Sequence, residues 1–392
     1  MKRCRRKEIM MKFKTSELKA AMGKLAGFIG DTIIIKCTGQ CLEGAEGTLL
    51  AQVQACNKTA QGMSVCCYSG DKEPKNMLFT NQIQAVVESL SVFGEEVVIE
   101  PMEDAAKVSC GTASVNVPFA SDAAEIKAVN ANDTLVLLFK KDDFQSAVNE
   151  GAYVQEEGTI PTLSKTCYIL PCVKEDGKRT VKICSTSGYL YGECECGVAI
   201  QESDAGLFEQ WAQKGLIVKS ASLLSVARSL NSDTLYVYLS DKQLMIVTGT
   251  EVYSFITVEG SFVNLKDVLK LRMLKDYELK IDKNRIKSAF KVIGLYTESG
   301  DGQMSANISI TEQENGKVKV CVSDVKEKNH VEFEAEGFGN KEIRVNKPQL
   351  IRALDHSAGD IVAIRGTENA PVIFIFGSNE AAFSFNSLCK KN

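Results

Sequence analysis

Apolar and polar residues follow one strand–helix pattern that occurs six times along this chain. Its first form opens three segments that align without gaps: 11–22, 137–148 and 279–290. Its second form begins at three further positions: Leu78, Val218 and Val345. In each copy an apolar strand end precedes a polar residue suited to a helix start, such as Ser16, and apolar residues then recur at i, i+3 and i+4. The pattern predicts six amphipathic helices, each preceded by a strand.

The spacing of these copies predicts three tandem domains of similar build. We expect a basic, disordered extension at residues 1–10, or a start codon placed upstream of the true one, and domains at 11–130, 133–275 and 276–392. Each domain holds two of the helices and about eight short strand-like runs. Helices and sheets with one apolar face each bury it by packing together, so we expect an α+β fold with two helices on two antiparallel sheets per domain. Any tandem α+β repeat could show this pattern.

Charge and hydrophobicity narrow the possible classes of protein. The formal net charge of -4 argues against a protein that coats nucleic acid with its whole surface, but it allows a local basic lining. No apolar run reaches the roughly 20 residues that cross a bilayer. The basic N-terminus lacks the apolar segment of a secretory signal. We therefore expect a cytoplasmic protein without a membrane anchor.

Residues suited to catalysis or metal binding are scarce. The sequence has no phosphate-binding loop, zinc-protease helix, nucleophile elbow or calcium loop. Its only histidines, His330 and His356, leave few candidates for acid–base work near neutral pH. The fourteen cysteines are best explained as free, mostly buried thiols; the alternative is that Cys194 and Cys196, on one face of a strand, hold a metal or serve a redox function. We expect no enzyme, no cofactor and no metal.

Four short motifs occur in an order that resembles one known family. They are Met11–Phe13 followed by a helix, Thr186–Leu190, Val258–Phe262 followed by Val268-Leu269, and Ala381–Phe385. With the sixfold repeat, they identify the chain as a divergent member of the bacterial sliding clamps, the β subunit of DNA polymerase III. The resemblance implies two crescent-shaped subunits that close head to tail into a ring-shaped homodimer, with helices lining the hole and sheets outside.

The resemblance also implies a function. A clamp is a non-catalytic processivity factor of DNA replication: it encircles double-stranded DNA without reading its sequence. It tethers the α subunit of the replicative DNA polymerase, the clamp loader and other proteins with clamp-binding motifs. A second class of protein stays open, an acidic repeat scaffold that binds proteins through the cleft between domains two and three without DNA.

Three sets of site residues follow from the resemblance. Helix faces opposite the apolar stripe would face DNA through these cations: Lys19, Lys24, Arg228, Lys287, Lys291 and Arg352. Carboxylates such as Asp142 and Asp355 on the same helices predict weak direct affinity. A partner-peptide cleft would be lined by Leu170, Thr186, Gly188, Tyr189, Leu190, Val263, Val268, Pro371, Phe385 and Leu388. Subunits would meet at Val115, Leu295 and Tyr296.

The cleft departs from the family pattern in several places. Tyr189 and Leu190 stand where the family has His and Arg, and Val263 replaces a proline. The family's Met-Pro-Met/Val-Arg ending is replaced here by the sequence at 386–390. The details of partner recognition are therefore expected to differ from those of the family.

Overall fold

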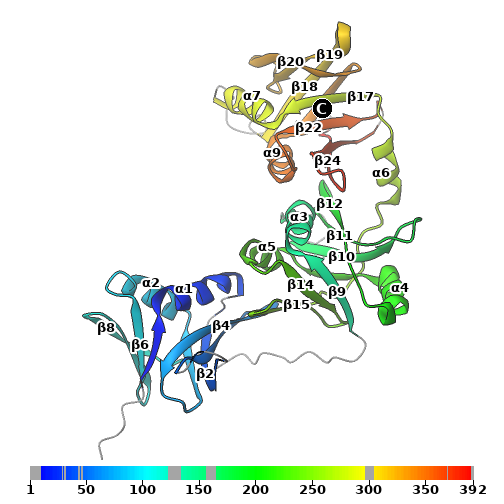
Figure 1. Cartoon of the computed structure of the whole chain (residues 1–392). Coiled ribbons are helices and arrows are strands. Elements are labelled where there is room, and N and C mark those ends of the chain that lie inside the picture. Colours follow the sequence, from blue (N-terminus) through cyan, green and yellow to red (C-terminus); the bar gives the residue numbers. More distant parts are fainter. Residues whose placement is uncertain are drawn as a thin grey trace, which may run out of the picture. The chain divides into compact units, whose positions relative to one another are not determined.

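The computed structural model describes residues 10–28, 30, 32–42, 45, 47–121, 134–155, 165–295, 304–368 and 370–389 (Figure 1). This part of the chain forms two compact units. The first combines residues 1–141, 200–204 and 225–257, and the second combines 142–199, 205–224 and 258–392. Residues 1–9 of the expected extension lie outside the described residues, as does Tyr296.

The first unit is built on a 12-stranded antiparallel sheet, sheet A. Its main path runs β8-β7-β6-β1-β4-β16-β15-β14-β9, and β3, β2 and β5 continue from the long strand β4. Helices α1 (Thr15–Lys24) and α2 (Gln82–Leu90) pack beside each other in this unit. The strands are β1 (Met11–Lys14), β2 (Thr32–Cys41), β3 (Leu49–Cys56), β4 (Ala60–Gly70), β5 (Lys75–Thr80), β6 (Glu96–Pro101), β7 (Ala105–Cys110), β8 (Ala113–Pro118), β9 (Leu135–Lys140), β14 (Thr234–Leu239), β15 (Gln243–Val247) and β16 (Glu251–Ile256).

The second unit is built on sheet B, which also has 12 antiparallel strands, in the order β13-β10-β11-β12-β24-β23-β22-β17-β20-β19-β18-β21. The strands are β10 (Thr166–Val173), β11 (Arg179–Thr186), β12 (Leu190–Gly197), β13 (Leu216–Lys219), β17 (Tyr277–Asp282), β18 (Ser305–Glu312), β19 (Lys317–Ser323), β20 (His330–Phe338), β21 (Lys341–Asn346), β22 (Ile361–Gly366), β23 (Val372–Phe376) and β24 (Ala382–Ser387). Helix α5 (Ser220–Ser229) follows β13.

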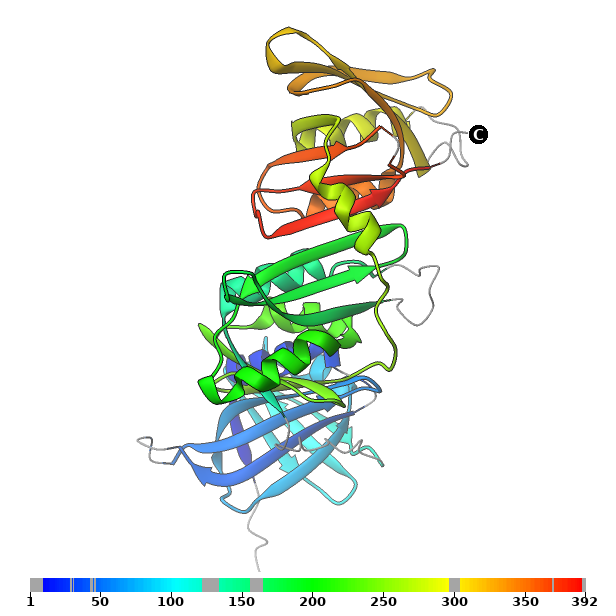
Figure 2. The same ribbon diagram turned by 90° about the vertical axis from the view of Figure 1, so that its right-hand side faces the viewer.

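Helices cover both faces of sheet B. In Figure 1, α3 (Lys141–Gly151), α7 (Lys283–Leu295) and α9 (Lys347–His356) lie on one side of its strands, whereas α4 (Ala205–Lys214) and α6 (Lys266–Lys270) lie on the other. Figure 2 shows the second side, with α4 and α6 in front of the strands. The face that carries α4 and α6 is called the outer face below.

The predicted α+β fold with large antiparallel sheets is confirmed, and so are the six predicted helices, which are α1, α2, α3, α5, α7 and α9. Their apolar stripes are buried as the helical spacing requires; Leu18 and Leu25 of the first stripe are 0% and 1% exposed. The division into domains at 11–130, 133–275 and 276–392 stays a prediction. Strands from 133–275 contribute to both sheets, because β9 and β14–β16 belong to sheet A and β10–β13 to sheet B.

The middle copy carries two helices, α4 and α6, in addition to the two that the repeat predicts. Helix α4 occupies the connection between β12 and β13, whereas short connections join the equivalent strands elsewhere in the repeat. The predicted helix starts hold only in part. Ser16 is the second residue of α1 and not its N-cap, which is Lys14 and makes no side-chain hydrogen bond. Helix α9 is capped by Asn346, one residue before the predicted Lys347-Pro348 start, and its side chain accepts from the Gln349 amide at 3.1 Å.

Candidate functional site

The Thr186–Leu190 turn, at the start of the predicted cleft, has a tightly bonded backbone. The Thr186 hydroxyl donates to the Leu190 carbonyl at 3.0 Å and accepts from the Gly188 amide at 3.0 Å. Gly188 has φ 88°, a conformation that favours glycine. The turn leaves the Tyr189 side chain 50% exposed, whereas Leu190 beside it is fully buried.

Beside this turn, residues of the predicted cleft form backbone hydrogen bonds with the last residue of β24 and the residue after it. The Ser387 amide donates to the Tyr189 carbonyl at 2.8 Å, and the Leu388 amide donates to the Pro371 carbonyl at 2.8 Å. Leu190 and Leu388 pack into the apolar core that also contains the stripes of α7 and α9. Leu190 therefore belongs to the helix side of sheet B.

The outer face carries an aromatic layer that includes Phe385. Tyr191, which follows Leu190 and so points to the opposite face, stacks on Phe385 with ring centroids 4.9 Å apart. Phe374 and Phe383 belong to the same layer. The connector that carries α6 packs over it through these half-buried side chains: Phe262, Leu265, Val268, Leu269 and Leu271.

Two contacts hold this connector at its ends. At one end, Phe262 stacks on Tyr168 with centroids 4.9 Å apart and an interplanar angle of 7°. At the other, the Arg272 guanidinium lies 5.1 Å from the Phe383 ring centroid and 3.8 Å from the buried carboxylate of Glu193. The structure thus groups Val268 and Phe385 of the predicted cleft. Val263 directly follows Phe262, and Leu170 lies two residues from Tyr168, on the same face of β10.

The predicted DNA-facing cations differ in their exposure and in their contacts with other side chains of the chain. Lys24 forms an ion pair with Glu251, and Lys287 forms one with Asp355. Lys19 donates to the Ser91 hydroxyl at 3.1 Å. Arg352 is half-buried, whereas Arg228 and Lys291 are exposed.

The Lys24–Glu251 pair lies in a shielded position, with the Glu251 side chain 4% exposed. Burial alone raises the pKa of Glu251, but hydrogen bonds from Lys24, Thr248 and Thr250 outweigh it and hold the pKa below its ordinary value. The Glu251 carboxylate therefore largely neutralises the Lys24 charge.

The thirteen cysteines in the described part of the chain are thiols that belong to no disulfide. Burial raises the pKa of the Cys194 thiol to about 12, and Asn379 donates to its sulfur at 3.5 Å. Burial also raises the pKa of Cys196 strongly. Among the residues with assigned positions, no three His, Cys, Asp or Glu side chains gather as metal ligands would.

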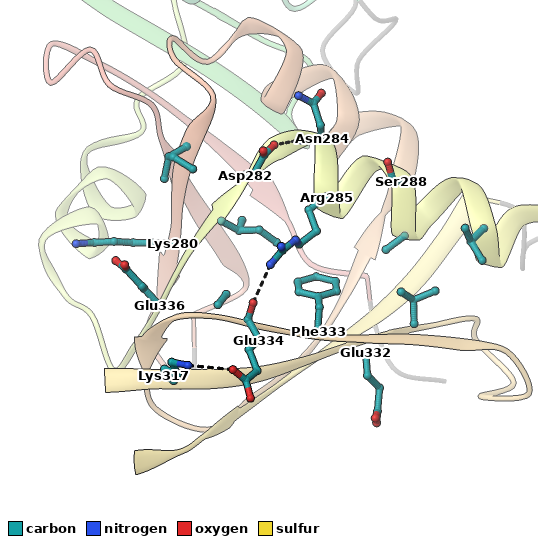
Figure 3. A pocket seen from close by; sticks show the side chains of 16 residues that line it. Lys280, Asp282, Asn284, Arg285, Ser288, Lys317, Glu332, Phe333, Glu334 and Glu336 are labelled. Atoms are coloured by element: carbon teal, nitrogen blue, oxygen red, sulfur yellow. Dashed lines mark hydrogen bonds and ion pairs between the residues drawn. The ribbon is translucent and has the colours of Figure 1, made fainter. Parts of the chain in front are cut away.

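A groove of about 1190 Å³ lies between α7 and β20 in the second unit (Figure 3). Its apolar walls include Val292, Val331, Phe333 and Ile361, and Val292 and Ile361 are 46% and 56% exposed. Leu295, a predicted subunit contact, ends α7 and is 71% exposed.

One edge of β20 is open beside this groove. Strand β19 pairs with β20 over His330–Glu336, but β17 reaches only Glu336–Phe338 on the opposite edge. No other strand in the described ranges pairs with residues 330–335 on that edge. In sheet A, β8 is likewise an end strand, paired with β7 alone among the described strands, and its Val115 is 40% exposed.

The repeat shows how such an edge is filled. Strands β4, β12 and β20 are equivalent, because their hairpins begin with three matching pairs: Cys56–Gln61, Thr186–Tyr191 and Ser323–His330. The edge of β4 is paired with β16, and that of β12 with β24. Both pairings share one register, since Glu251 and Ala382, the first residues of β16 and β24, lie opposite Ser64 and Cys194.

The comparisons with known proteins place this fold. No protein-family model matches the sequence, and no curated protein matches it. Solved structures do match over 98% of this chain and the whole of theirs. The DNA polymerase III β subunit of Thermotoga maritima has a TM-score of 0.77 at 12% identity, the DNA polymerase sliding clamp of Bacillus subtilis 0.77 at 11%, and the DNA polymerase III subunit β of Pseudomonas aeruginosa 0.75 at 14%. The chain therefore has the fold of the bacterial sliding clamps.

Sequence reasoning missed two features of the candidate sites. The first is the aromatic layer on the outer face, although its signal is visible in the alternating phenylalanines of 383–385. The second is the groove at the open edge of β20. Its signal was the alternation of apolar residues and glutamates in 331–336, which predicts a strand with only one buried face.

Proposed function

We propose that this chain is a DNA sliding clamp, a divergent and non-catalytic member of the bacterial β-subunit family. The observation that carries the proposal is the whole-chain match to solved clamps, at TM-scores of 0.74 to 0.77 over 98% of the chain. The sixfold repeat supports it independently, because three tandem domains at 11–130, 133–275 and 276–392 can supply the pseudo-symmetry of a ring. No described helix has the length and apolarity to cross a membrane, and we place the function in the cytoplasm, with DNA.

The ring would be a head-to-tail homodimer. Transferred to β20 and the β8 of a second copy, the register of the repeat places Ala113 opposite Phe333 and Val115 opposite Val331. The groove would then close under β8, and Leu295 would gain an apolar neighbour. Such a contact joins two different surfaces, so it forms a closed object only when the rotation per subunit completes a circle. Light scattering should give twice the 42.8 kDa of one chain.

DNA would be held by enclosure rather than by tight contact. Phosphates can be neutralised by cations without base recognition, and such binding weakens steeply with salt. Two of the six candidate cations, Lys24 and Lys287, already have carboxylate partners. Arg228 and Lys291 are the exposed candidates, so charge reversal at these two should lower retention on DNA more than reversal at Lys24 and Lys287.

Partner proteins would dock on the outer face of the second unit. The exposed Tyr189 side chain offers an apolar rim, and the connector over the aromatic layer supplies a wall. Short extended peptides bind best to apolar grooves with a few polar anchors. The expected partners are the polymerase α subunit, the clamp loader and other proteins with clamp-binding motifs.

The decisive experiment measures retention on DNA by shape. The protein is loaded on a nicked circular plasmid with a bacterial clamp loader and ATP, passed through gel filtration, and the plasmid is then cut. A clamp stays on the circle and is lost after linearisation, and Val331→Asp, which should prevent ring closure, is not retained. Equal retention on circular and linear DNA would exclude enclosure. An acidic scaffold, the alternative function, would show no retention but would still bind peptides.

A further inference from the structure

We propose that Arg285 sets the register of the strand pairing between two copies, by closing the last open carbonyl of β20. The inference rests on the homodimer proposed above. Arg285 lies on the first turn of α7 and points into the groove (Figure 3). Its Nη1 donates to the Glu334 carbonyl at 3.0 Å, and its guanidinium lies 5.9 Å from the Phe333 ring centroid.

Glu334 occupies the position of the repeat at which strand pairing ends on the edges of β4 and β12. The Val65 amide donates to the Thr250 carbonyl at 3.1 Å, and the Glu195 amide donates to the Ala381 carbonyl at 2.9 Å. Val65, Glu195 and Glu334 occupy the same position of the repeat. In the dimer the Glu334 amide would donate to the carbonyl of Thr112 of the second copy, in the turn that joins β7 to β8.

In this register the Glu334 amide is bonded, but the Glu334 carbonyl receives no hydrogen bond from the second copy. A strand paired in a shifted register would use this carbonyl. If β8 slid by two residues, Ser114 of the second copy would lie opposite Glu334 and donate to that carbonyl, because residues of a hydrogen-bonded pair exchange both bonds. The guanidinium already holds this acceptor, and hydrogen bonds from charged donors are the stronger ones. From Glu336 onward the edge is closed by β17.

The opposite end of the ladder is closed by proline. The Ile256 amide donates to the Thr59 carbonyl and the Ser387 amide to the Tyr189 carbonyl, each at 2.8 Å. The equivalent residue of β8 is Pro118, which has no amide hydrogen and cannot continue a ladder. Arg285 therefore limits the pairing at one end of the ladder, and Pro118 limits it at the other.

The other two edges have no such arginine. The residues equivalent to Arg285 are Glu17 in α1 and Asp143 in α3. Burial raises the pKa of Cys66 and of Cys196 in the neighbouring strands, and these two carboxylates lie close enough to add to the rise. Those edges receive their strand from the same chain, so the covalent connection fixes the register. Only the edge that must select a strand from solution carries a positive side chain at this position, as natural sheets do to prevent wrong pairing.

Disulfide trapping in the full chain tests this role. Val331→Cys with Val115→Cys reports the expected register, and Phe333→Cys with Val115→Cys reports the register shifted by two. Each pair is placed in the otherwise native chain, in the Arg285→Ala variant, and in a matched charge-loss control, Lys178→Ala in the β10–β11 turn. Dimers are counted on non-reducing gels after mild oxidation, against the parent chain with its native cysteines. Thermal melting confirms that each variant folds.

With Arg285 present, the shifted pair should give little dimer compared with the expected pair. Arg285→Ala should raise the ratio of shifted to expected dimer by about tenfold, the change typical of losing one charge-assisted hydrogen bond. Lys178→Ala should leave the ratio unchanged. An unchanged ratio in Arg285→Ala overturns this role but leaves the dimer standing. A chain that gives no dimer with either pair overturns the homodimer and this inference together.

Discussion

Asn386 offers a direct test of the core between β12 and β23. Its side chain is fully buried, and neither its amide nitrogen nor its carbonyl oxygen has a hydrogen-bond partner among the described residues. In the sheet it lies between Leu190 and Ile373, which belong to the apolar core. Replacing Asn386 with leucine, a side chain of similar size, should therefore stabilise the protein.

The expected gain follows from the cost of burying unpaired polar groups. Leaving one buried donor or acceptor unsatisfied costs about 1–3 kcal/mol, and Asn386 has both kinds. A change of side-chain shape in a packed core costs about 1 kcal/mol in return. With two unpaired groups and this packing cost, the net effect of Asn386→Leu should be a rise of about 1–5 kcal/mol in the free energy of unfolding of the second unit.

Urea unfolding measures this change through Trp211, the only tryptophan, which is buried in the second unit. Asn379→Leu is the matched control, because the Asn379 amide donates to the Glu150 carboxylate at 2.8 Å. That variant should lose stability, since it leaves Glu150 without this donor. If Asn386→Leu unfolds at lower urea than the parent chain, the polar atoms of Asn386 have partners and the reasoning is refuted.

Three further predictions concern named contacts. Lys24→Ala should destabilise the first unit by about 3 kcal/mol near neutral pH, because it leaves the Glu251 charge buried without its partner. The pKa of Glu251 is lowered, so the stability that its charge contributes is lost as pH falls through that lowered value. The difference in melting temperature between the variant and the parent chain should therefore shrink in acid. Burial raises the pKa of Glu150. The stability that Glu150 contributes is therefore present below the ordinary carboxyl pKa and is lost as pH rises through the raised value. Urea midpoints of Glu150→Gln should lack this loss of stability with rising pH. Tyr189→Ala should weaken a Gln-Leu-x-Leu-Phe peptide, expected to bind at roughly micromolar strength, by about 1 kcal/mol or more in fluorescence anisotropy, whereas an unchanged affinity would move the site elsewhere.

The periodic parts of this fold could be predicted because a single physical rule governs them. A helix on a core must repeat its apolar residues at helical spacing, and all six helices do so. Helix α4 breaks the repeat, since it is an insertion in one copy only. Its buried Phe208 and Trp211 form a shorter stripe that the comparison of copies could not reveal.

The candidate cleft was harder to predict because strand side chains alternate. A difference of one position along β12 decides which face a side chain joins. Leu190 lies in the core on the helix side, and Tyr191 next to it lies in the aromatic layer on the outer face. Motif resemblance locates the strand, but it does not determine which of two neighbouring residues a partner can reach.

The two sheets do not coincide with the copies of the repeat. Sheet A takes β4 from the first copy and β16 from the second, and sheet B takes β12 from the second and β24 from the third. Cutting the gene at a repeat boundary would therefore separate paired strands and expose their edges to aggregation. A fragment meant to be expressed alone should follow the sheets instead, and circular permutation within the middle copy would tolerate new termini better than excision of one copy. The sequence repeat and the two sheets are therefore offset from each other along the chain.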